Sequence, residues 1–179
     1  MKLVVTAPSP AATTATLSVN GKTYPCTLGR AGVTGPAEKT EGDGKTPLGV
    51  YPLRLLYYRA DRVAKPETGL PLKVLTPETG WCEDPSHPDY NREISLPHPA
   101  GHDHMTRADA LYDYVVVVGY NDSPVVTGKG SAIFIHLARP DFSPTAGCVG
   151  LRAEDMRELL KICNETSTIE IRLETGTVA

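Results

Sequence analysis

The sequence predicts a mainly β, α+β protein with one clear helix near its C-terminal end. Three observations support this fold class. Short runs rich in β-branched and aromatic residues recur along the chain, and turn residues separate them. Glycine and proline number 16 each, which favours many short elements over long helices. A helical spacing of apolar residues is clear in one segment, 152–163.

Length and composition predict a single domain spanning residues 1–179. Hydrophobic residues make up 40% of the chain and charged residues 22%, as in ordinary globular proteins. The formal net charge is −3 and no basic run occurs, which argues against nucleic-acid binding. The apolar run at the N-terminus is too short for a signal peptide, and we find no membrane span. We therefore expect a cytoplasmic protein, or a periplasmic one if a leader has been removed.

The first elements are expected to be a hairpin and a long strand. Residues 15–29 place Asn20-Gly21 between alternating apolar residues, which is a strong hairpin signal. Residues 48–58 form the next β-type run. Between them, Gly42, Gly44 and Lys45 lack the spacing of a phosphate-binding loop and fit a hairpin turn better.

Three further strands are expected in the second half. Residues 114–120 are apolar throughout and rich in valine, which predicts a central strand buried on both faces. Residues 131–138 form a second buried run. Residues 167–174 alternate apolar with polar side chains and should be half-buried.

The clear helix is predicted at 152–163, where Met156, Leu159, Leu160 and Cys163 share one face. A second, weaker helix is expected within 97–113. The middle of the chain, residues 76–104, carries five prolines and four of the five histidines. Such long irregular regions inside compact domains are often functional.

His136 and Cys148 form the candidate catalytic pair. His136 ends a buried strand, which would hold its ring as a general base requires. Cys148 follows Gly147 and precedes the predicted helix, where backbone N–H groups favour a thiolate and an oxyanion. Considered alone, a single cysteine and histidine are more often structural than catalytic.

Other clusters offer weaker candidates. His98, His102 and His104 lie near Asp103 and Asp109, and such residues can bind zinc, although a solvated loop explains them better. Trp81 and Tyr112 are candidates to line a substrate cleft, with core packing at least as good an explanation. The four cysteines show no paired spacing, which argues against a four-ligand zinc site of the usual kind, while two disulfides remain open. The three besides Cys148 are interpreted as structural.

Several segments together resemble the L,D-transpeptidase catalytic domain, or YkuD, family. Thr145-Ala146-Gly147-Cys148 is similar to that family's Ser/Thr-His-Gly-Cys motif after a strand-borne histidine. The segments 39–53, 80–92 and 111–121 resemble further parts of a branch of this family, in the same order. The resemblance covers most of the chain and implies a β-sandwich with a helix following the cysteine.

The resemblance also implies a reaction. In this family the cysteine attacks the carbonyl of the third residue of a peptidoglycan stem tetrapeptide, D-Ala leaves, and a thioester forms. An amine acceptor then gives a 3→3 cross-link or an exchanged D-amino acid, whereas water gives L,D-carboxypeptidase activity. The expected partners are therefore stem peptides or muropeptides. No cofactor and no metal are expected, and the sequence leaves the oligomeric state open.

The resemblance assigns roles to particular residues. Cys148 is the nucleophile, His136 the base, and the Leu137 carbonyl orients the histidine. The N–H groups of Gly147 and Cys148 are candidate oxyanion donors. Thr145 belongs to the motif and is expected near the substrate.

Two departures bear on specificity: Ala146 replaces the motif histidine, and Gly150 stands where the family has an arginine. We expect Arg152 or Arg139 to take over that charge. The lack of an export signal favours an L,D-carboxypeptidase that recycles muropeptides. The alternatives are a cell-wall L,D-transpeptidase and, because of both departures, a peptidoglycan-binding module without catalysis.

Overall fold

The computed structural model describes residues 1–175 and confirms a mainly β protein with one helix. The helix is α1, Ala153–Ile162. The first seven strands are β1 Lys2–Ala7, β2 Thr14–Val19, β3 Lys22–Thr27, β4 Val33–Thr34, β5 Thr46–Pro47, β6 Gly49–Tyr58 and β7 Leu72–Val74. The remaining strands are β8 Thr79–Cys82, β9 Glu93–Ser95, β10 His102–His104, β11 Tyr114–Val118, β12 Phe134–Leu137, β13 Val149–Leu151 and β14 Thr168–Leu173.

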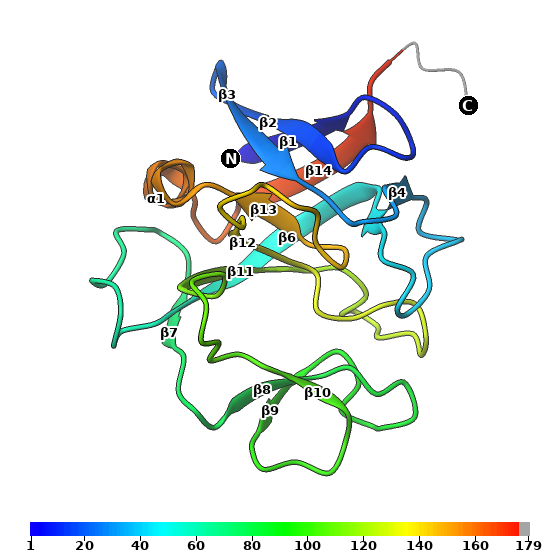
Figure 1. Cartoon of the computed structure of the whole chain (residues 1–179), viewed down its shortest axis with the longest axis vertical. Helices are drawn as coiled ribbons and strands as arrows, with labels where there is room; N and C mark the ends of the chain where they lie inside the picture. Colours follow the sequence, from blue (N-terminus) through cyan, green and yellow to red (C-terminus); the bar gives the residue numbers. More distant parts are fainter. Residues whose placement is uncertain (176–179) are drawn as a thin grey trace.

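The main sheet closes on itself into a sandwich-like barrel. Its order is β11-β12-β13-β3-β2-β1-β14-β6-β7, and β6 also pairs with β11. The ten-residue strand β6 makes this closure possible, because Gly49–Pro52 pair with β14 and Leu53–Tyr58 pair with β11. Figure 1 shows this sheet above a separate small sheet of β8, β9 and β10.

The predicted hairpin is confirmed, with β2 and β3 pairing in antiparallel register. Asn20 and Gly21 both have positive φ, 49° and 76°, as a type I′ turn requires. The prediction of a hairpin turn at Gly42 and Gly44 is wrong. The strands around it, β4 and β5, pair in parallel, so residues 35–45 form a loop and not a hairpin. The Asp43 carboxylate holds this loop by accepting the Thr40 and Lys45 N–H groups.

Two hydrophobic cores meet at β11 and β12. Side chains alternate across a strand, so Tyr114, Val116 and Val118 enter the core inside the barrel. Val115 and Val117 enter a second core between the barrel and the small sheet. The prediction that this strand is buried on both faces is therefore confirmed.

The helix α1 lies where the sequence places it, with Met156, Leu159 and Leu160 buried in the barrel core. The second helix predicted within 97–113 is wrong for the described structure. That segment contains β10, which pairs with β8, followed by turns. The Asp109 carboxylate accepts the Leu111 N–H, a local bond that competes with helix formation.

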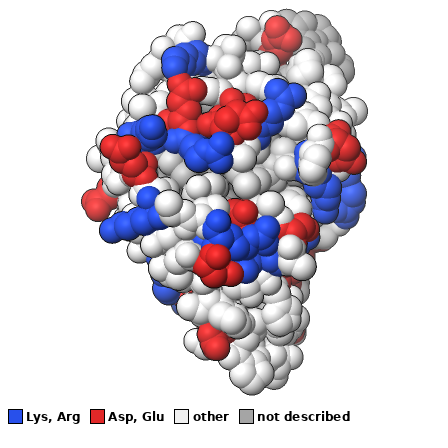
Figure 2. Space-filling view, turned by 60° about the vertical axis from the view of Figure 1, so that its left-hand side comes forward, with Lys and Arg blue, Asp and Glu red and all other residues white. Residues whose placement is uncertain are grey.

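Two features of the whole molecule bear on function. Within residues 1–175 there is no helix with the length and apolar character that crossing a bilayer requires. Acidic and basic residues are interleaved over the face in Figure 2, without a broad patch of one sign, and the end formed by the small sheet carries few charges there.

Candidate active site

Strand alternation brings His136 and Cys148 to the same face of the main sheet. Ile135 and Val149 are paired in the parallel register of β12 and β13, and both enter the barrel core. Their neighbours Phe134, His136 and Cys148 therefore point to the opposite side, toward the small sheet.

Gly150 occupies a tightly packed position in the strand beside the histidine. It is the register partner of His136, and a Cβ atom at Gly150 would lie 2.3 Å from the Thr27 hydroxyl oxygen. A side chain at this position would require the Thr27 side chain to move and would press on the Ala138 main chain. The structure thus gives a reason for the departure from the family arginine.

The His136 ring is fixed by a short hydrogen bond. Its Nδ1 lies 2.8 Å from the Leu137 carbonyl oxygen. Because a carbonyl only accepts, Nδ1 carries the proton and Nε2 keeps its lone pair. Burial lowers the pKa of His136 from 6.5 to about 4, against the opposing effect of the Leu137 carbonyl. The ring is therefore a neutral base at neutral pH.

The Cys148 thiol is buried and protonated. Its Sγ lies 3.2 Å from the Ala132 carbonyl oxygen, to which it donates, and 3.4 Å from the Phe134 nitrogen, from which it accepts. Burial raises the pKa of this thiol to about 12, and the Phe134 N–H opposes the rise only in part. Within residues 1–175, no hydrogen bond joins the sulfur to the His136 ring.

The expectation of a thiolate stabilised by a helix start is wrong for this state. Strand β13 separates Cys148 from α1, whose N-cap residue is Arg152. The helix dipole acts over the first turn, so it does not reach the sulfur.

The turn before the cysteine is held by Thr145. Its hydroxyl oxygen accepts the Gly147 N–H at 3.1 Å and donates to the Cys148 carbonyl oxygen at 2.7 Å. Thr145 is itself anchored to the loop after β3 through main-chain bonds to Leu28 and Arg30. Because the Gly147 N–H is used inside the turn, the Cys148 N–H is the stronger oxyanion candidate of the two.

Two hollows meet at Cys148. The smaller, of about 120 Å³, contains His136 and Arg139. The larger, of about 360 Å³, contains charged side chains of both signs, and Cys148, Ala146, Arg107 and Tyr112 line both hollows. The charged residues in the larger hollow are Arg30, Lys39, Glu41, Glu83, Asp103 and Arg107.

Tyr112 joins the histidine to the small sheet. Its ring lies edge-on to His136, with centroids 5.3 Å apart, and its hydroxyl donates to Asp103 at 2.6 Å. The Arg107 guanidinium lies 5.2 Å from the centre of the same ring. Tyr112 therefore lies at the site, as the sequence suggested.

Of the other residues expected to contact substrate, one lies at the site and two do not. Arg139 lines the smaller hollow, whereas Arg152 lines neither and lies over the Phe142 ring at 5.2 Å. Trp81 lies behind the site: its ring packs edge-on against Phe134, and its Nε1 donates to Asn91.

Sequence reasoning missed the charged wall formed by Glu83, Asp103 and Arg107. These residues lie in the irregular region or beside it, where no strand pattern was recognised. The antiparallel register pairs Trp81 with Asp103, and Glu83 lies two residues beyond Trp81. Strands of four and three residues show no readable period, and Arg107 lies outside both, so the sequence carried no signal that placed these residues at the site.

The histidine-rich cluster is arranged differently from the expectation. Asp103 is bound by Tyr112 and Asp109 by Arg107, while His98 lies near His87 and Asp89. Both rings are 3.6 Å from the Asp89 carboxylate. Backbone N–H groups donate to the Nδ1 atoms of both rings, which ties them into the turns of this loop.

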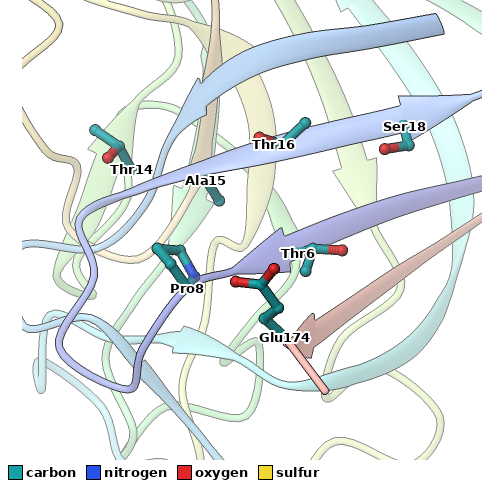
Figure 3. Close-up of a pocket in the computed structure, with 7 residues that line it drawn as sticks. All are labelled: Thr6, Pro8, Thr14, Ala15, Thr16, Ser18 and Glu174. Atoms are coloured by element: carbon teal, nitrogen blue, oxygen red, sulfur yellow. The ribbon is translucent and has the colours of Figure 1, made fainter. Parts of the chain in front are cut away.

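Two further features concern the cysteines and a hollow away from the site. All four cysteines are free thiols, so neither possible disulfide is formed. A separate hollow of about 350 Å³ lies on the outer side of β1 and β2 (Figure 3). It is lined by hydroxyl groups and the Glu174 carboxylate and contains no thiol or imidazole.

The fold and the site define a candidate thiol-dependent acyl-transfer protein, with a histidine in β12 and a cysteine directly before the adjacent strand β13. Comparison with known proteins identifies the family. A model of the L,D-transpeptidase catalytic domain, YkuD, matches residues 6–171. The chain therefore belongs to the YkuD family.

One solved structure aligns with most of this chain. Mycobacterium tuberculosis L,D-transpeptidase 1 aligns at 18% identity with a TM-score of 0.38, over 95% of this chain and 58% of that one. This chain thus spans just over half the length of that protein. No curated protein matches the sequence.

Proposed function

We propose that this protein catalyses cysteine-dependent acyl transfer on peptidoglycan stem tetrapeptides, cleaving the L,D bond to the terminal D-Ala. The observation that carries the proposal is the placement of His136 and Cys148 on one sheet face beside a shared hollow. Membership of the YkuD family supports the substrate class.

In the first step the Cys148 proton moves to Nε2 of His136 as the sulfur attacks the substrate carbonyl carbon. Concerted transfer suits a pair in which both partners are neutral at rest. The Cys148 N–H stabilises the oxyanion. When the carbon–nitrogen bond breaks, His136 returns the proton to the departing D-Ala amine, leaving a thioester.

The acceptor decides the outcome. Water gives a tripeptide, the L,D-carboxypeptidase reaction that the sequence analysis favours for soluble muropeptides in the cytoplasm. An amine gives a cross-linked or exchanged product, which is the transpeptidase reaction and requires access to the cell wall. Both outcomes share the thioester on Cys148.

The experiment is mass spectrometry of a purified muropeptide tetrapeptide incubated with the protein, with Cys148→Ala as the control. Tripeptide and free D-Ala, absent with the variant, would support hydrolysis. A cross-linked or exchanged product would support transpeptidation. Binding of the tetrapeptide without thioester or turnover would overturn the proposal and favour the peptidoglycan-binding module.

A further inference from the structure

The larger hollow contains two opposed sets of charges around Cys148. Arg30, Lys39 and Arg107 supply positive charge, and Glu41, Glu83 and Asp103 supply negative charge. Glu83 follows β8 directly, and its N–H donates to the Gly101 carbonyl, which fixes the main chain at this point.

The other anionic groups of this hollow are already bound. Glu41 accepts hydrogen bonds from the hydroxyls of Tyr90 and Ser131. Asp103 accepts the Tyr112 hydroxyl. Within residues 1–175, the Glu83 carboxylate has no hydrogen-bond or ion-pair partner.

The surroundings of Glu83 suit proton exchange. Burial, followed by the charges of Asp103 and Glu41, raises its pKa to about 7. An acid–base group with a pKa near the working pH is the most effective for proton transfer in either direction.

His136 and Glu83 line different hollows at the nucleophile. His136 lines only the smaller of the two hollows, and Glu83 lines only the larger, whereas Cys148 lines both. The site therefore has a second acid–base group that the attack by the thiol does not use.

We infer that Glu83 is the base that removes a proton from the ammonium group of an amine acceptor at the Cys148 thioester. This inference rests on the proposed function, because it requires an acyl group on Cys148. An amine enters as an ammonium ion, which has no lone pair for attack. Its first proton passes to the Glu83 carboxylate, and the free amine attacks the thioester carbon.

The remaining steps release the product and restore the thiol. The carbon–nitrogen bond forms, the carbon–sulfur bond breaks, and the second proton of the nitrogen passes to Nε2 of His136. His136 then returns that proton to the leaving thiolate, while Glu83 releases its proton to solvent. The acceptor class is therefore a primary amine that arrives protonated.

The test compares two nucleophiles after acylation by the tetrapeptide. Glycinamide arrives largely protonated and needs a base, whereas hydroxylamine is uncharged at neutral pH. Glu83→Gln keeps the side-chain shape but removes the base. We expect transfer to glycinamide to fall about 10²-fold and transfer to hydroxylamine to be maintained, with products counted by mass spectrometry.

Glu78→Gln is the matched control, because Glu78 is an exposed residue just before β8 and lines neither hollow. It should leave both transfers unchanged. Glu83→Asp keeps a carboxylate and should restore part of the glycinamide transfer.

An equal loss with both nucleophiles in Glu83→Gln would overturn the inference, as would no loss with either. Failure of the proposed function is seen separately, because then the unmodified protein forms no thioester on Cys148, as intact-protein mass spectrometry would show. That result would remove this inference along with it.

Discussion

The Nδ1 atom of His136 lies 2.8 Å from the carbonyl oxygen of Leu137, its own neighbour in β12. The bond uses a main-chain acceptor, so no acidic side chain is required to orient the ring. It leaves Nε2 free of a proton, and the residue lines the smaller hollow. Strand geometry therefore fixes the orientation of the His136 ring, and burial determines its pKa.

The first prediction is that acylation keeps its rate well below the pH at which an ordinary histidine protonates. Burial lowers the pKa of His136 from 6.5 to about 4, so the neutral base persists until the pH falls to about 4. The measurement is the rate of thioester formation against pH by intact-protein mass spectrometry. Circular dichroism at each pH is the control for folding, and a midpoint near 6.5 would contradict the structure.

The second prediction concerns alkylation of the free thiols. Because burial raises the pKa of Cys148 to about 12, its thiolate fraction is small at neutral pH and grows with every rise in pH. We expect the rate of its reaction with iodoacetamide to increase through pH 9 without a plateau. Peptide mapping identifies the labelled cysteine.

Cys26 and Cys163 serve as internal controls, because burial also raises their pKa values, to about 12 and about 11. Neither lines the two hollows at the site. A plateau in the Cys148 rate near neutral pH would show a stabilised thiolate and contradict the resting state described above.

The helix and the longer strands β2, β3, β6, β11, β12 and β14 could be predicted from sequence because each carries a local signal. Residues 114–118 consist of β-branched and aromatic residues, and Asn20-Gly21 encodes its own turn. The pair that we propose as nucleophile and base was also visible, because Gly147-Cys148 follows a buried strand that ends in His136.

The charged wall of the site could not be predicted in this way. Glu83 and Asp103 face the thiol only because β8 and β10 pair, and these strands of four and three residues are too short to show a period. The expectation that Cys148 is a stabilised thiolate was also wrong. Burial raises the pKa of this thiol, and the burial comes from tertiary packing in the cluster that contains Phe134 and Tyr112.

The third prediction is that Gly147→Ala damages both stability and acylation. Gly147 has φ of +142°, and an added Cβ would lie 2.9 Å from the Lys45 carbonyl oxygen. Backbone strain costs about 1–2 kcal/mol, and the contact adds to it by displacing the turn that carries Cys148. Urea unfolding and the rate of thioester formation measure the two effects.

Gly128→Ala is the matched control for that variant. Gly128 also has a positive φ, +76°, but a Cβ there meets no atom within 4 Å. It should lose stability through strain alone and keep its acylation rate. If both variants acylate at the normal rate, the close contact with Lys45 does not position the nucleophile.

The fourth prediction concerns the hydroxyl of Thr145, which joins the two residues on which the attack depends. Thr145→Val keeps the branched shape but removes the oxygen that accepts the Gly147 N–H and donates to the Cys148 carbonyl. Leaving a buried N–H without a partner costs about 1–3 kcal/mol, which should appear in the free energy of unfolding. Displacement of the sulfur should lower the acylation rate by up to about 10²-fold.

Thr145→Ser separates this hydrogen-bonding role from simple packing in a buried position. Serine keeps both hydrogen bonds and loses one methyl group, which costs about 1 kcal/mol or less. We therefore expect Thr145→Ser to acylate at close to the normal rate while Thr145→Val does not. Equal rates in the two variants would mean that the turn holds Cys148 in place through its main-chain bonds to Leu28 and Arg30 alone.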